Sequence, residues 1–83
     1  MSLARFEVET HYMKQEVAET ICAMVDDVLE RLQMFNNYIQ DNRDDLPIAQ
    51  FSLAVGTCVA ELDLKILEPV YRQFPHLKPT YLP

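Results

Sequence analysis

AETICAMVDDVLERLQMFNNYI, residues 18–39, contains the pattern that decides the fold. Apolar side chains recur along it at alternating steps of three and four, the spacing of one face of an amphipathic helix. The members of this stripe are Ala18, Ile21, Val25, Val28, Leu32, Phe35 and Ile39. Further apolar side chains border the stripe, so the apolar arc is wider than a two-stranded coiled coil needs. The sequence therefore predicts a helix over 10–42 that is covered by more than one neighbouring helix.

A second helix is predicted after the acidic segment DNRDDLP, residues 41–47. Asp and Asn compete locally for backbone hydrogen bonds, and Pro47 suits a first helical turn. We expect Asp44 or Asp45 to cap a helix over 46–68, which must stop or kink where Pro69 removes a backbone donor. Because the connection is short, the two helices are expected to form an antiparallel hairpin.

The two ends of the chain are less regular. Residues 5–12 fit both a strand pattern and a helix pattern. Because no second strand is visible to pair with the first, we expect a helix or loose extended structure over 1–9, and strand and disorder stay open as alternatives. Over 69–83 we expect a short turn followed by an extended tail, because three prolines follow Phe74. The whole chain is long enough for a single domain.

The only glycine, Gly56, lies within the second predicted helix, where it costs about 1 kcal/mol relative to alanine. If the bend centres on Asp44, Leu32 lies opposite Gly56. Ser52, Gly56 and Ala60 recur every four residues, so one helix face is lined by small side chains. We expect Gly56 to make room for a large side chain, either Leu32 or one from a second subunit. A tolerated glycine, a local kink and a small-ligand cavity are the alternatives.

Self-association is predicted because the second helix carries apolar residues on every flank, which one partner helix cannot cover. We expect a homodimer that forms a four-helix bundle. The expected packing and dimer core consists of Ile21, Val25, Val28, Leu32, Phe35, Ile39, Phe51, Val55, Gly56, Val59 and Leu62.

The charge balance argues against nucleic acid and anionic membranes as partners. Thirteen acidic and seven basic side chains give a net charge of −6, and the basic residues form no stripe that would neutralise phosphates. The uncharged run between Asp45 and Glu61 is shorter than the roughly 20 residues of a bilayer span. Cys22 and Cys58 are too few for a disulfide framework, and no secretory leader pattern is visible, so we expect a cytoplasmic protein.

Neither catalytic residues nor a cofactor or metal site is predicted. The acidic side chains fall on the polar face, no Glu-x-x-His spacing is present, and one glycine cannot build a phosphate-binding loop. In the expected hairpin Cys22 and Cys58 lie too far apart for a disulfide, and both are expected to be buried.

The expected function is that of a non-enzymatic protein–protein interaction module: an adaptor, regulator or small chaperone acting as a homodimer. A small-molecule-binding or metal-binding helical bundle is the alternative. The identity of the protein partner is not encoded in any motif, but its surface is expected to include Met34, Tyr38, Tyr71, Leu77 and Tyr81.

Overall fold

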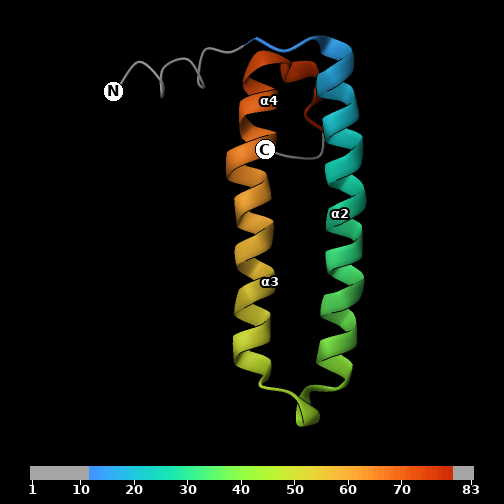
Figure 1. Cartoon of the computed structure of the whole chain (residues 1–83), viewed down its shortest axis with the longest axis vertical. Helices are drawn as coiled ribbons and strands as arrows, with labels where there is room; N and C mark the ends of the chain where they lie inside the picture. The colour runs from blue at the N-terminus through green and yellow to red at the C-terminus, as the bar shows by residue number, and fades with distance from the viewer. Residues whose placement is uncertain (1–11, 80–83) are drawn as a thin grey trace, which may run out of the picture.

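The computed structural model describes residues 12–79, which are all-α and contain no strand (Figure 1). This confirms the predicted all-α class for that part of the chain; the expectation for residues 1–9 lies outside the described residues. The longer segments are α2 (Gln15–Asp41), α3 (Ile48–Leu62) and α4 (Glu68–Gln73). Figure 1 shows α2 and α3 side by side with opposite directions, and α4 continuing the line of α3 beside the first turns of α2.

The connection between α2 and α3 differs from the expected capped turn. Arg43–Asp45 form a 3-10 turn, and α3 starts at Ile48 after Pro47, without a side-chain cap. Asp44 and Asp45 therefore do not cap α3. The backbone instead supplies the first bond, because the Phe51 N–H donates to the Pro47 carbonyl at 3.1 Å.

The register between the two helices is also shifted. The Gln40 Nε2 donates a hydrogen bond of 3.0 Å to the Ser52 Oγ, so the pairing centres on Leu46 rather than on Asp44. Since the 3-10 turn adds residues to the connection, α3 is displaced by about one helical turn from the expected register. Leu32 does not approach within 4 Å of the Cβ position of Gly56.

The face of α2 that meets α3 has a different phase from the predicted stripe. Its buried and half-buried members are Ala18, Cys22, Val25, Leu29, Leu32, Asn36 and Ile39. They too alternate steps of four and three, so they form an unbroken heptad seam. Val28 and Phe35, which we expected in the core, remain 47% and 48% exposed. The predicted stripe therefore spans the buried seam and a second, exposed apolar face, and a dimer core that includes Val28 and Phe35 stays a prediction.

The hydrophobic core lies at the end of the helical pair where α4 meets α2. Val25, Leu67 and Tyr71 form its centre. Half-buried Ile21, Cys22, Leu29, Leu62 and Leu77 pack around them. Tyr71 is only 8% exposed, so its expected place on a partner surface is wrong: the helix carries it back against α2. Leu77 also packs on this cluster and so closes the core from the C-terminal side.

The chain remains helical through Pro69 and does not stop there. Asp63–Leu67 form a π-helical turn, in which the Glu68 N–H donates to the Asp63 carbonyl five residues back. Pro69 then lies in the first turn of α4, where its missing N–H leaves no bond unmade. The wider turn accommodates the proline without ending the helix, which is why the expected single helix over 46–68 is replaced by three consecutive helical segments.

We expected an extended segment after Phe74, but part of it is helical. Pro75–Leu77 form a second 3-10 turn, and the Phe74 and His76 rings meet edge to face with centroids 6.1 Å apart. The N-terminal end of α2 is linked to α4, because the Met13 N–H, just before α2, donates a hydrogen bond of 3.1 Å to the Gln73 Oε1. These contacts hold the core end of the molecule together.

Leu67→Ala should lower the free energy of unfolding by about 2–4 kcal/mol, because it opens a cavity in the small core. Leu64→Ala is the matched control, since Leu64 lies on the same π turn but is 62% exposed. It should change stability by no more than about 0.5 kcal/mol. Urea unfolding followed by circular dichroism measures both, and equal losses for the two variants would contradict the placement of the core.

Candidate functional site

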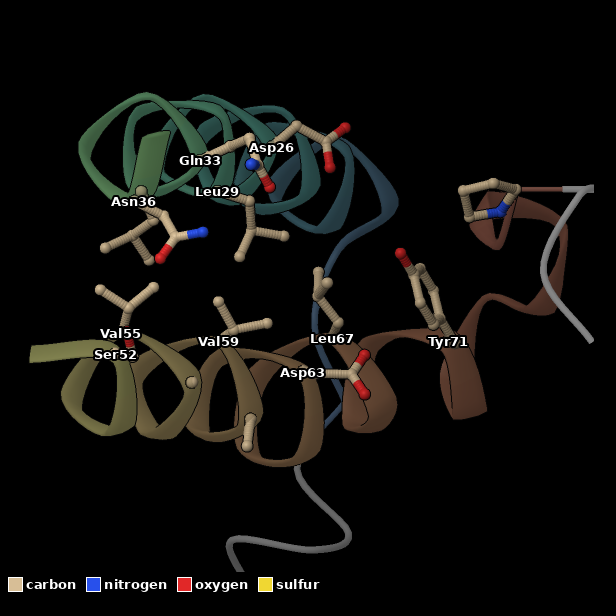
Figure 2. Close-up of a pocket in the computed structure, with 14 residues that line it drawn as sticks. Asp26, Leu29, Gln33, Asn36, Ser52, Val55, Val59, Asp63, Leu67 and Tyr71 are labelled. Atoms are coloured by element: carbon tan, nitrogen blue, oxygen red, sulfur yellow. The ribbon is translucent and has the colours of Figure 1, made fainter. Parts of the chain in front are cut away.

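A groove of about 700 Å³ lies between α2 and α3 (Figure 2). Figure 2 shows α2 as one wall and α3 as the other, with Leu29, Val55, Val59 and Leu67 between them. The full lining is Asp26, Leu29, Leu32, Gln33, Asn36, Ser52, Val55, Gly56, Val59, Ala60, Asp63, Leu67, Tyr71 and Pro79. The groove is thus apolar along its centre and polar along its margins, as binding surfaces commonly are.

The small side chains of α3 line this groove. Ser52, Gly56 and Ala60 all belong to the lining, one helical turn apart. A Cβ added at Gly56 would meet no atom within 4 Å, and its φ is not positive. The expected close packing of Leu32 on Gly56 is therefore wrong for the single chain. The backbone conformation at this position does not require glycine either. What Gly56 provides is open space on the α3 wall.

Two carboxylates from different helices lie on opposite walls of the groove. Asp26 belongs to α2 and Asp63 follows α3, and Figure 2 shows both towards the end that carries Leu67 and Tyr71. Neither forms a salt bridge with any described residue; Lys65, two residues after Asp63, pairs with Glu61 at 2.8 Å. No basic side chain lines the groove. This end of the groove therefore has an uncompensated negative charge.

A second candidate surface is the exposed apolar face of α2, which we call the outer stripe. It consists of Val17, Ile21, Met24, Val28, Arg31, Phe35 and Tyr38. The five large apolar members other than Ile21 are between 45% and 66% exposed. The spacing is again that of an unbroken heptad repeat, and Arg31 is its only charged member. At 3.6 residues per turn, the outer stripe lies roughly opposite Asp26 and Gln33 on α2, so it faces away from the acidic margin of the groove. Leu29, Leu32 and Asn36 lie between these two faces.

The other expected site residues are distributed over several surfaces. Of the expected core, Val25 and Ile39 are buried; Ile21, Leu32, Phe51, Val55 and Leu62 are half-buried; and Gly56 and Val59 are exposed. Met34 and Tyr38 are exposed, whereas Tyr81 lies outside the described residues.

The sequence reasoning did not single out Leu29, Asn36 and Leu67 as lining one site. The heptad repeat that contains Leu29 and Asn36 could have indicated this face of α2, but the polar side chain of Asn36 interrupts its apolar pattern.

The two cysteines have different environments and both are free. Cys22 is half-buried beside the core, and burial, followed by the nearby Asp26 carboxylate, raises the pKa of its thiol. The thiol therefore stays protonated at neutral pH and is a poor nucleophile. Cys58 is exposed, which corrects the expectation that both are buried.

Within the part of the chain that the structure describes, no three His, Cys, Asp or Glu residues converge to hold a metal ion.

No family model matches the chain, and neither a curated protein nor a solved structure shows significant similarity to it. Of the described helices, none combines the length and the apolar character needed to cross a membrane.

Gly56→Ala should raise the free energy of unfolding by about 0.5–1 kcal/mol, because alanine favours the helix and meets open space here. The reverse change at a nearby exposed position of α3, Ala54→Gly, should lower it by a similar amount. Urea unfolding of both variants tests this. A loss of stability in Gly56→Ala would show that another atom already occupies this space.

Proposed function

We propose that the chain is a non-enzymatic protein–protein interaction module that acts as a homodimer through the outer stripe of α2. The observation that carries the proposal is that stripe: Val17, Met24, Val28, Phe35 and Tyr38 are exposed at heptad spacing on one helix face. Contiguous exposed apolar surface marks sites of association, and heptad spacing is the pattern with which helices pack along a seam.

The outer stripe is complementary to itself when two α2 helices pair antiparallel. With the two-fold axis near Leu29 and Glu30, Met24 of one copy lies opposite Phe35 of the other. Methionine sulfur packs favourably on aromatic rings, and a two-fold interface uses the same patch on both copies. Two helical pairs joined in this way build a four-helix bundle.

The same pairing gives Arg31 a partner. Arg31 lies within the outer stripe and forms no salt bridge with another described residue. In the antiparallel pair it comes next to Asp27 of the second copy, so the charge at the centre of an apolar seam is compensated. Such a charge also fixes the register of the pair, because sliding α2 by one turn would leave Arg31 among apolar side chains.

The alternative function, a small-molecule-binding bundle, is favoured by one observation. The groove volume of about 700 Å³ falls within the range of ligand pockets, about 300–1,000 Å³. However, both of its carboxylates are exposed and the groove runs along the helices, which suits an elongated protein segment better than a small enclosed ligand. We therefore place protein binding first.

At micromolar concentration, sedimentation equilibrium should give twice the chain mass of 9.7 kDa. The double variant Met24→Glu, Phe35→Glu should sediment as a single chain, because it places four acidic side chains in the paired seam. Leu53→Glu is the matched control: Leu53 is 72% exposed, lies on α3 and does not belong to the outer stripe.

Circular dichroism should show that all three proteins remain helical. A wild-type chain that sediments as a monomer would refute the homodimer. A double variant that remains dimeric would refute the outer stripe as its interface.

A further inference from the structure

We infer that the groove between α2 and α3 binds an amphipathic helix of a partner protein that presents a cationic side chain to Asp26 and Asp63. This inference rests on the proposed function, since it assigns a partner class to the interaction module. Asp26 and Gln33 lie on the face of α2 opposite to the outer stripe, so the acidic margin of the groove stays accessible in the proposed homodimer.

The dimensions of the groove fit a short helix. Its lining on α2 runs from Asp26 to Asn36, which is about 15 Å at 1.5 Å per residue, or nearly three helical turns. Over that length a partner helix presents apolar side chains at i, i+3 or i+4, and i+7. Leu29, Leu32 and Val59 provide the apolar surface that these side chains would cover.

The α3 wall permits close approach of a helix backbone. The smallest residues of the lining are Ser52, Gly56 and Ala60. A Cβ on Gly56 would meet no atom within 4 Å. Small residues at one-turn intervals allow two helices to pack closely. A partner helix that lies over Gly56 also explains why a helix tolerates glycine at this position.

The charge of the groove selects the partner. Asp26 and Asp63 lie on opposite walls, have no salt-bridge partner among the described residues, and share the groove with no basic side chain. An arginine from a partner helix would pair with a carboxylate of this margin through two parallel hydrogen bonds, because its guanidinium offers several donors in a fixed plane.

A second copy of this chain fits the groove less well than another protein does. Its outer stripe carries apolar residues and Arg31, but the stripe and Asp26 lie on opposite faces of α2. A stripe-to-groove contact would therefore join two different surfaces and would build a ring or open chains instead of a two-fold dimer. The acidic groove on a chain of net charge −6 points to a partner that is more basic than the chain itself.

Fluorescence anisotropy with the full chain tests this inference. The probe is a labelled alanine-rich peptide of about 16 residues, long enough for partial helicity, with leucines at i, i+3, i+4 and i+7 and one arginine between them. The matched peptide carries glutamine in place of arginine. At low salt the arginine peptide should bind about three- to tenfold more tightly, and added salt should reduce that preference.

Two double variants with the same change of charge locate the binding site. Asp26→Asn with Asp63→Asn should abolish the preference for the arginine peptide while leaving the affinity of the glutamine peptide unchanged. Asp44→Asn with Asp45→Asn alters the exposed turn between the helices and should keep the preference. Equal affinity of the wild-type chain for both peptides, or the same loss in both double variants, would overturn the inference.

Gly56→Leu tests the shape of the groove independently of its charge. The added side chain should weaken binding of both peptides at least tenfold, while the sedimentation mass stays that of the wild type. Dissociation of a dimer by Gly56→Leu would mean that a second copy occupies the groove, and would overturn the inference. If the wild type is monomeric but shows the arginine preference, the groove assignment is supported and only the homodimer fails.

Discussion

The structure depends on one constraint: α2 carries an apolar arc of roughly half its circumference, and a single neighbouring helix covers only part of it. The seam from Ala18 to Ile39 meets α3, whereas the outer stripe from Val17 to Tyr38 remains exposed. Each stripe alone has the heptad spacing of a helix–helix contact. Among residues 12–79, no further helix covers the second stripe.

The helices of this fold follow from the sequence, but their phase and register do not. Ala18 and Ile39 belong to the predicted stripe and are buried, yet Phe35 belongs to it and is exposed, because two adjacent apolar faces allow several stripes to be drawn. The register depended on the assumed centre of the turn, which the 3-10 segment Arg43–Asp45 moved. Pro69 was expected to stop or kink the helix, and the π turn before it lets the chain stay helical through Pro69. These outcomes come from tertiary packing and turn geometry, which no local pattern encodes.

Gly56 illustrates how a correct signal led to a wrong contact. A glycine in a strong helix indicated a close approach, and the shifted register removed Leu32 as the approaching residue. The space remained, now as part of a groove that also contains Asp26 and Asp63. The sequence showed Asp26 only as a member of the polar face of the first predicted helix and did not single out Asp63, because their positions on opposite walls require the fold. The chemistry of the candidate site thus comes from the pairing of α2 with α3.

The two surfaces are connected through α2, which has the outer stripe on one side and Asp26 and Gln33 of the groove margin on the other. In the proposed two-fold dimer, the acidic margins of both grooves would face away from the seam, so the assembly would offer two equivalent sites to basic helices. A partner with two such helices would gain from the effective concentration of the second site. Both proposed contacts require the folded pair of α2 and α3, so each of them would stabilise the helical pair that the other uses, and the two would favour each other by linkage.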